Sequence, residues 1–451
     1  MRYRSPKKGG WELAPREIAR GWPLAALALA AARMASGQDA LRNFLTGETV
    51  TQNQSLQQQQ MQQLSSQPYT IKSGDFRLLA TPSMEVDWND NVNAVNRNQQ
   101  SDIILEPFLQ LTGTYPLTQR NLLSLTLGAG YYEYLHYTSY SGVRLNSDSQ
   151  LAFDVAVKDF KFNFHDRFSL TEDSSTEPGV AGTAVFGGFM NTVGVTTMWD
   201  LGDVILTLNY DHQNYLSTVS EFDYLNRSSE LPVLRAAARL GPALTAGLEG
   251  SAGLTTYDQA VLNNNDSYSA GVFADWNKGS FFRVQPRFGY TIYDFDQTSR
   301  SDNVYVFGTH TQSTVVETKN LDAWYADLTL THKASPAINY GFSAGHEVRL
   351  GIEADTIEDY YFRPNINWAA FKNVSLNFNF FYEHGNQGEG NVLGNIVEKY
   401  DWFGGGLTAA YPLMKRLTLN LICRFTRRLS DISTQEYTQN VVGLRLTYQL
   451  P

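Results

Sequence analysis

The sequence predicts an all-β protein, a transmembrane antiparallel up-and-down β-barrel of about 18 strands, with 16 strands as the alternative count. Three observations predict this fold. From about residue 76 onward, apolar and polar residues alternate in segments of roughly ten residues. The connectors between these segments are alternately short and long. Aromatic residues make up 13% of the chain and gather near segment ends, where spanning barrels carry aromatic girdles.

Alternation with a period of two gives a strand two different faces. In residues 160–170 phenylalanine alternates with polar side chains, and the pattern recurs in 374–383, 417–428 and 441–449. One face of such a strand suits lipid and the other suits water. The weakest alternation lies in two further segments, and these decide between 16 and 18 strands: 189–199 and 264–276.

The lengths of the connectors give the barrel two different rims. Short turns at one rim and longer loops at the other are typical of outer-membrane barrels. We expect short turns near 116–119, 158–159, 200–203, 241–243, 277–279, 333–337, 371–373 and 412–415. We expect longer loops near 90–100, 139–147, 173–188, 217–228, 258–265, 297–318, 351–357, 385–396 and 429–435.

The barrel must be closed. In hydrocarbon every backbone N–H and C=O needs a partner within the protein, and an open sheet would leave two unpaired edges. We therefore expect the strand near 76–90 to pair with the last strand near 436–449. A barrel of this size is wide enough for an aqueous lumen.

The region before the barrel divides into two parts. Residues 1–37 combine basic residues, an eleven-residue apolar run from Trp22 and a small-residue Ala35-Ser36-Gly37 site, which is the pattern of a signal peptide. Residues 38–75 are rich in Gln and Ser and cannot bury a core. We expect them to form a flexible periplasmic segment, with a lumen plug as the alternative. The barrel is then 76–451.

Composition excludes several classes of protein. The formal net charge of −10 is opposite to that of a nucleic-acid-binding protein. Cys423 is the only cysteine, so neither an intrachain disulfide nor a cysteine metal site can form. We expect no cofactor and no bound metal.

Both signs of charge lie on the polar face and make candidate pore-lining residues. Opposed arginines and carboxylates would create a transverse field in a pore; the alternative is that they only neutralise one another. The loops 297–318 and 173–188 are the candidates for folding inward. The pore-lining candidates are Glu85, Asp87, Glu106, Asp154, Arg167, Asp211, Arg235, Arg239, Glu249, Arg283, Arg287, Asp327, Arg363, Glu383, Arg424, Arg428 and Arg445.

Catalytic patterns are weak. The sequence has neither an H-E-x-x-H nor a G-x-S-x-G motif. His165 with Ser169, or His346 with Ser343, could form a Ser–His pair of the kind that some barrel lipases use. So many serines make such pairs by chance, and we expect no catalytic residues.

The first predicted hairpin resembles a known family. Residues 86–92 read VDWNDNV, and residues 101–111 read SDIILEPFLQL. An NDN strand end, an SD start and a mid-strand proline resemble the putative β-barrel porin type 2 family. The resemblance implies an outer-membrane β-barrel, often near exopolysaccharide export systems, and it brings no catalytic residues.

The expected function follows from the barrel and this resemblance. We expect a porin-like channel in the cell outer membrane for passive diffusion of small polar solutes. Its partners would be outer-membrane lipid, lipopolysaccharide and those solutes, and not nucleic acid. Two alternatives stay open: an accessory or export barrel for surface exopolysaccharide, working with polysaccharide export machinery, and an occluded structural or adhesive protein.

Overall fold

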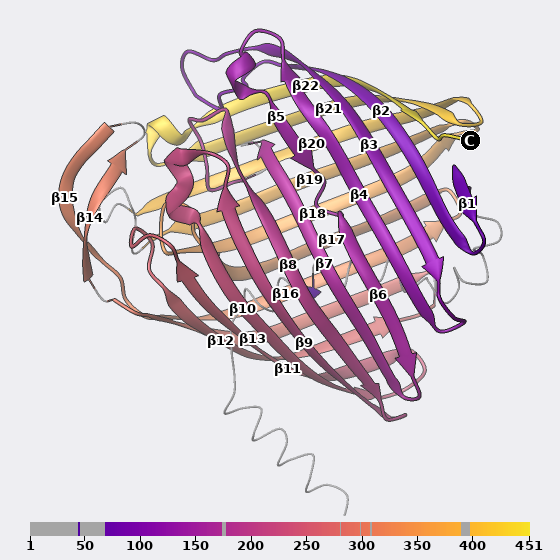
Figure 1. Cartoon of the computed structure of the whole chain (residues 1–451). Coiled ribbons are helices and arrows are strands. Elements are labelled where there is room, and N and C mark those ends of the chain that lie inside the picture. Colours follow the sequence, from indigo (N-terminus) through magenta and orange to yellow (C-terminus); the bar gives the residue numbers. More distant parts are fainter. Residues whose placement is uncertain are drawn as a thin grey trace, which may run out of the picture.

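The fold is a closed antiparallel β-barrel of 18 strands (Figure 1). The computed structural model describes residues 44–45, 68–173, 177–279, 281–297, 299–306, 309–388 and 397–451. Among these residues no helix is long and apolar enough to cross a membrane. The predicted signal peptide and most of the Gln-rich segment lie outside the described residues, so their boundaries stay predictions.

The strands follow one another around the wall in chain order. β5 and β6 share one position, because β4 pairs with both of them. The short β1 (Ile71–Ser73) pairs with β2 alone. The wall consists of β2 (Phe76–Asn89), β3 (Asp102–Pro116), β4 (Asn121–Tyr134), β5 (Gly142–Leu145), β6 (Gln150–Val157), β7 (Phe160–Asp173), β8 (Val185–Asp200), β9 (Val204–Ser217), β10 (Arg227–Arg239), β11 (Leu244–Tyr257), β12 (Asn265–Asn277), β13 (Phe282–Phe295), β16 (Leu321–Ser335), β17 (Ile338–Leu350), β18 (Thr356–Phe371), β19 (Val374–Gln387), β20 (Glu398–Met414), β21 (Leu417–Ser430) and β22 (Tyr437–Tyr448).

The first and last wall strands close the barrel. β2 pairs with β22 from Ser83 opposite Thr447 to Asn89 opposite Val441. The backbone N–H of Leu450 also donates to the carbonyl of Ala80 at 3.0 Å. The predicted closure is therefore confirmed. The two weakly patterned segments form β8 and β12, so the count is 18 and not 16.

The two faces of each strand differ as the alternation predicts. On β2 the side chains of Met84, Val86 and Trp88 are 39–48% exposed, whereas Glu85 and Asp87 between them are at most 3% exposed. Apolar side chains thus point outward and charged ones inward. Since an outward apolar band suits lipid, the protein is built to span a membrane with its strands.

The two rims also differ as predicted. The eight expected short turns join strands at one rim, for example Lys158 and Asp159 between β6 and β7. The longer connectors lie at the other rim, and in their described parts three of them contain short 3-10 helices: η2 (Thr138–Tyr140), η4 (Ser220–Leu225) and η5 (Ser433–Gln435). We call the second rim the mouth.

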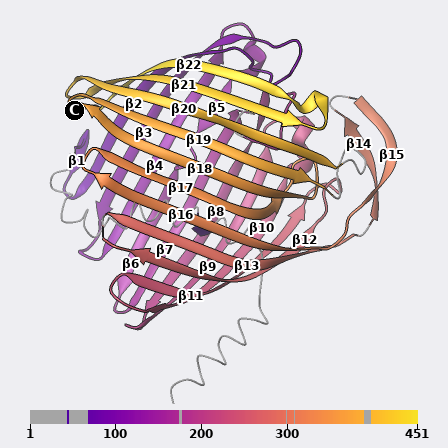
Figure 2. The ribbon, with the colours of Figure 1, turned by 180° about the vertical axis from the view of Figure 1, so that it is seen from behind.

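Only one of the two loops expected to fold inward does so. Within 297–318, β14 (Ser299–Val306) and β15 (Thr309–Glu317) form a separate two-stranded sheet that extends beyond the wall (Figures 1 and 2). The expectation that this loop narrows the pore is wrong, because its strands pair with each other instead. The connector between β7 and β8 enters the mouth, as described below.

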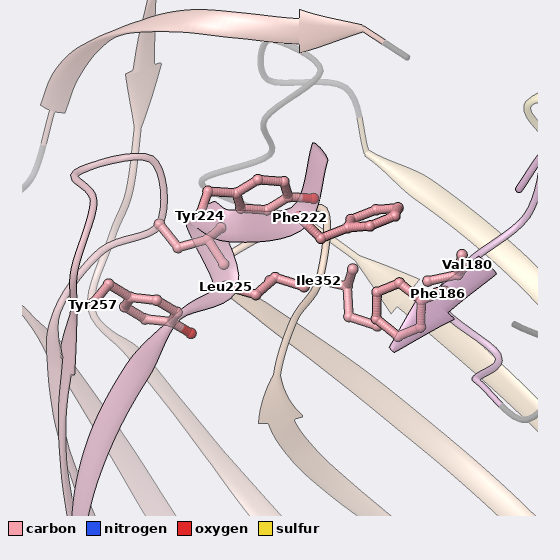
Figure 3. Packing of buried hydrophobic residues seen from close by; sticks show 8 residues of the cluster. Val180, Phe186, Phe222, Tyr224, Leu225, Tyr257 and Ile352 are labelled. Carbon is pink, nitrogen blue, oxygen red and sulfur yellow. The ribbon is translucent and has the colours of Figure 1, made fainter. Parts of the chain in front are cut away.

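Apolar side chains from several connectors pack together at the mouth (Figure 3). The rings of Phe186 and Phe222 meet edge to face with their centroids 4.9 Å apart. Ile352 joins this cluster from the connector that follows β17, a strand whose pairing with β16 stops at His346 and whose pairing with β18 continues to Leu350. The mouth cluster consists of Val180, Phe186, Phe222, Tyr224, Leu225, Tyr257, Leu262 and Ile352.

Candidate functional site: the lumen wall and the mouth

The inner wall is lined with ion pairs. On the section around β2, three buried carboxylates each bind an arginine that lies one or two strands away along the wall. The carboxylates lie against the wall, whereas the side chains of Arg424 and Arg445 are 47% and 40% exposed. The pairs are Glu85 with Arg445, Asp87 with Arg424 at 2.8 Å, and Glu106 with Arg144 at 2.9 Å.

A second ion-pair cluster lies on β10, β11 and β13. Glu249 accepts from Arg287 at 2.9 Å and from Arg235 at 3.2 Å. The hydroxyl of Tyr325 also donates to Glu249, at 3.2 Å. One buried carboxylate therefore balances two guanidinium groups, and Arg235 in addition lies over the ring of Phe273, 3.9 Å from its centroid.

On β7 and β9, Asp211 accepts from Arg167 at 2.7 Å and contacts Nε2 of His165 at 2.9 Å. The Nδ1 atom of His165 contacts Asn163 at 2.8 Å, and Asn163 also donates to Asp154. Both ring nitrogens of His165 are thus engaged, so the structure does not assemble the candidate pair with Ser169.

The second candidate pair is not assembled either. The Nε2 atom of His346 contacts Glu358 at 2.8 Å, and the ring lies between Trp324 and Tyr360, with centroids 4.0 and 4.4 Å away. These partners place His346 in a packed aromatic cluster on the wall rather than beside Ser343.

The remaining candidates lie at two levels along the barrel axis, some on the wall and some near the short turns. Arg363 binds Glu383 at 2.9 Å, and Asp327 accepts from the hydroxyl of Tyr361 at 2.8 Å. Arg239 and Arg283 lie near the short turns, where they bind Asp200 at 2.7 Å and Asp275 at 2.5 Å. All seventeen candidates thus have a partner on the wall or at the short-turn rim, and Arg428, which is described next, also binds two connectors.

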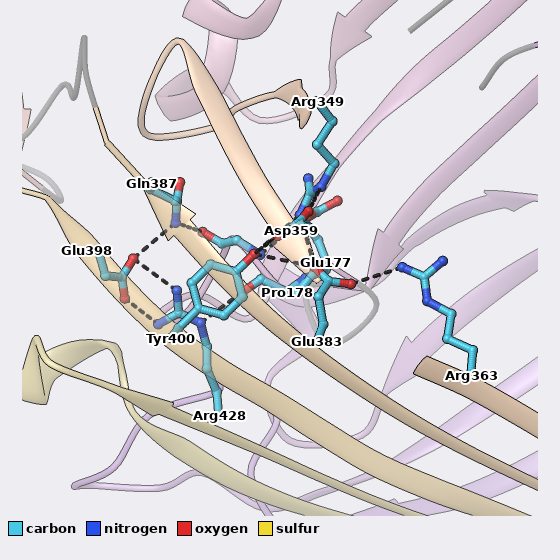
Figure 4. Close-up of polar contacts among 11 residues, drawn as sticks. Glu177, Pro178, Arg349, Asp359, Arg363, Glu383, Gln387, Glu398, Tyr400 and Arg428 are labelled. Carbon is cyan, nitrogen blue, oxygen red and sulfur yellow. Dashed lines mark hydrogen bonds and ion pairs between the residues drawn. The ribbon is translucent and has the colours of Figure 1, made fainter. Parts of the chain in front are cut away.

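The connector between β7 and β8 crosses the mouth and binds the opposite wall (Figure 4). Glu177 contacts Arg349 at 3.2 Å, and the carbonyl of Gly179 accepts from Gln387 at 3.3 Å. Gly182, at a positive φ of 77°, donates its N–H to the carbonyl of Ala94. Since β9–β13 and β16 separate β8 from β17 along the wall, residues 177–184 span the lumen; we call them the crossing loop.

Arg428 fastens the crossing loop. Its side chain is fully buried and donates to Glu398 at 2.7 Å, to the carbonyl of Pro178 at 2.8 Å and to the carbonyl of Gln435 at 2.8 Å. Its guanidinium also lies over the ring of Tyr400 at 4.5 Å. One side chain thus joins the wall to two connectors. Arg428 was predicted to line the pore, and in the structure it is a buried residue that holds the mouth together.

Glu353 lies in the connector between β17 and β18, buried at the mouth. Burial, and then the neighbouring carboxylate of Glu398, raise the pKa of Glu353 to about 7, against the opposing effect of Arg428. Gln435 donates to this carboxyl group at 3.4 Å. The closed mouth therefore favours a neutral Glu353 in mildly acidic solution.

Sequence reasoning missed the residues that hold the crossing loop. Arg349 binds Asp359 at 2.5 Å and Glu383 at 3.3 Å, and the hydroxyl of Tyr400 also contacts Asp359. Alternation could have placed Arg349 inward, since it shares a face with Gly341 and other small residues of β17. Nothing in the pattern of that strand indicates that it meets a loop from the far wall.

The residues that carry the family resemblance build connectors. The buried carboxylate of Asp102 accepts the backbone N–H groups of His136 and Tyr137 at 2.9–3.1 Å. Asp90 binds both the backbone and the side chain of Asn440, and Asn91 donates to the carbonyl of Thr438. The NDN residues thus hold the mouth end of the closure together, whereas Asp102 holds the connector that follows β4.

The chain was compared with curated proteins and with solved structures. No curated protein matches the sequence. Solved structures that resemble it include OpdL of Pseudomonas aeruginosa, 12% identical, with 84% of this chain and 100% of that chain covered and a TM-score of 0.43. OccK2 (OpdF) of the same organism is 10% identical, with coverages of 83% and 98% and a TM-score of 0.45.

The family comparison covers the first part of the barrel. Residues 66–279, from just before β1 to just after β12, match the family described as "Putative beta-barrel porin 2". This confirms the resemblance read from the first hairpin, and family and fold together point to a channel and not to an enzyme. The chain is an outer-membrane β-barrel whose residues 66–279 match the family described as "Putative beta-barrel porin 2".

Proposed function

We propose that this barrel is a channel for passive diffusion of small polar solutes across the outer membrane, with the crossing loop narrowing its mouth. The observation that carries the proposal is the exposure of inward-facing arginines. Arg363, Arg424 and Arg445 point into the barrel, yet 40–47% of each side chain is exposed. A charged group so exposed on an inner face requires water there, because an ion in a dry interior is strongly destabilised.

The wall chemistry also supports polar solutes. Each of these arginines binds a carboxylate that is itself at most 4% exposed. A solute in the lumen would therefore meet guanidinium groups first, with the balancing charge behind them. Donor groups in a wetted pore favour solutes that can accept hydrogen bonds.

Conductance of the purified, refolded full-length chain in planar bilayers tests the proposal. We expect current steps, and we expect liposomes that contain the protein to swell in small sugars or amino acids faster than empty ones. If neither the wild type nor a variant with a released crossing loop (Arg428→Ala) gives current or swelling, the channel proposal is wrong. The barrel would then be an occluded structural protein.

The predicted polysaccharide export machinery receives no support from the family match or from the solved structures. Swelling assays separate the two functions. Passive diffusion predicts that rates fall steeply with solute size. Uptake of a long polysaccharide chain at a rate similar to that of a disaccharide would contradict the proposal.

A further inference from the structure

The otherwise polar lumen wall contains an apolar niche. On β10 the side chains of Leu231 and Val233 are 1% and 2% exposed, and they pack with Tyr325 of β16. Arg235, two residues further along the same face, borders the niche. Apolar groups that face an aqueous lumen are unfavourable unless something covers them.

The side chain that covers the niche belongs to the N-terminal segment. Phe44 is 3% exposed and packs against Leu231, Val233 and Tyr325, and Leu45 packs beside it. The guanidinium of Arg235 lies 5.4 Å from the centroid of the Phe44 ring, within cation–π range. Figures 1 and 2 show this short indigo segment within the barrel outline from front and back.

The length of chain between Phe44 and the barrel is sufficient for this arrangement. Residues 46–67 join the two parts, and an extended chain advances at most ~3.6 Å per residue, so they reach up to roughly 80 Å. Leu231 lies eight positions from the short-turn end of β10, or about 26 Å along the strand at ~3.3 Å per residue. The chain that precedes β2 is therefore long enough for Phe44 to reach the niche.

We propose that the niche is an internal binding site for Phe44 and Leu45 of the chain's own N-terminal segment, and that these two residues narrow the lumen when they are docked there. Phe44 is the anchor, and Leu231, Val233, Tyr325 and Arg235 form its receptor. The proposal differs from the expected periplasmic tail at this point of the chain. Of the two tests that follow, only the conductance measurement rests on the proposed channel function.

Cross-linking tests the site without reference to transport. In a Cys423→Ser background, Phe44→Cys with Leu231→Cys should be joined by a short bismaleimide, giving a band of altered mobility on denaturing gels. The control is Tyr69→Cys with Leu231→Cys, because Tyr69 is exposed and contacts Lys72 and Arg77 beside β2. No more product than in this control would overturn the proposal.

Conductance then tests whether the docked residues narrow the lumen. Phe44→Ala and deletion of residues 38–67 should each raise the single-channel conductance by about twofold or more, whereas Tyr69→Ala should leave it unchanged. Val233→Ser removes the receptor surface and should act like Phe44→Ala. If the wild type conducts, and if Phe44→Ala, Val233→Ser and the deletion all leave its conductance unchanged, the docked residues do not narrow the lumen and this part of the proposal is overturned. Cross-linking without any current from any variant would instead support the site and contradict the channel.

Discussion

The guanidinium of Arg428 donates to the backbone carbonyl of Pro178 at 2.8 Å, across the lumen from the strands that carry the crossing loop. The same group forms a fully buried ion pair with Glu398. A buried guanidinium that binds one carboxylate and two backbone carbonyls is held in a single orientation. The position of the crossing loop therefore depends on this residue more than on its own length.

Replacing Arg428 should release the mouth. Arg428→Ala removes the bonds to Pro178, Gln435 and Glu398 and leaves a buried carboxylate unpaired, at a cost of about 3–5 kcal/mol. We expect larger and noisier currents in planar bilayers. The double variant Arg428→Met with Glu398→Met should show the same currents with smaller destabilisation, because no charge is left unpaired. The matched control is Arg427→Ala, whose exposed side chain belongs to the other face of β21.

The stability of the closed mouth should depend on pH through Glu353. Its pKa is raised from 4.5 to about 7 in the closed mouth, so between these values the closed state binds a proton that the open state releases. Closure is thus strongest below pH 4.5 and weakens progressively as the pH rises to about 7, by at most about tenfold per pH unit. Open probability in bilayers should rise over that window. Glu353→Gln should abolish the rise; a rise that persists in this variant would assign it to another group.

The exposed arginines should set the charge selectivity of the pore. Arg363→Gln removes a charge from the lumen, and Glu383 stays balanced because Arg349 also binds it. We expect the reversal potential in a salt gradient to shift toward cation preference, with stability changed by about 1 kcal/mol or less. Arg239→Gln, at a similarly exposed site by the short turns, is the control. Equal shifts in both variants would contradict a role for the lumen wall.

The strand order, the closure and the two rims could be predicted from the sequence, because lipid imposes them. A strand with one face in hydrocarbon must alternate, and its backbone must be paired on both edges. That Asp87 faces the lumen and Trp88 faces lipid follows from that requirement alone. The same argument places Glu249 and Arg287 on the inner face without saying that Glu249 also binds Arg235.

The mouth could not be predicted, because loop length does not determine where a loop goes. The long connector at 297–318 satisfies its backbone through its own hairpin. The crossing loop enters instead because Arg428 and Gln387 on the far wall offer donors to its carbonyls. Phe44 was missed for a related reason: an isolated aromatic residue in a Gln-rich segment has no periodicity to mark it.

The pairing of β2 with β22 can be tested by adding a methyl group where the two strands lie closest. Gly443 on β22 faces Asp87 of β2 so closely that an added Cβ would clash with Oδ1 of that carboxylate. Gly443→Ala must therefore displace Asp87 from Arg424, and we expect a loss of about 1–3 kcal/mol, typical of overpacking. Gly250→Ala is the control, since its added Cβ would meet only the carbonyl oxygen of Ser269 at 3.7 Å. Urea midpoints, read from the heat-modifiable gel shift, should fall for the first variant alone. Equal midpoints would mean that the β2–β22 seam tolerates displacement and contributes less to barrel stability than its register indicates.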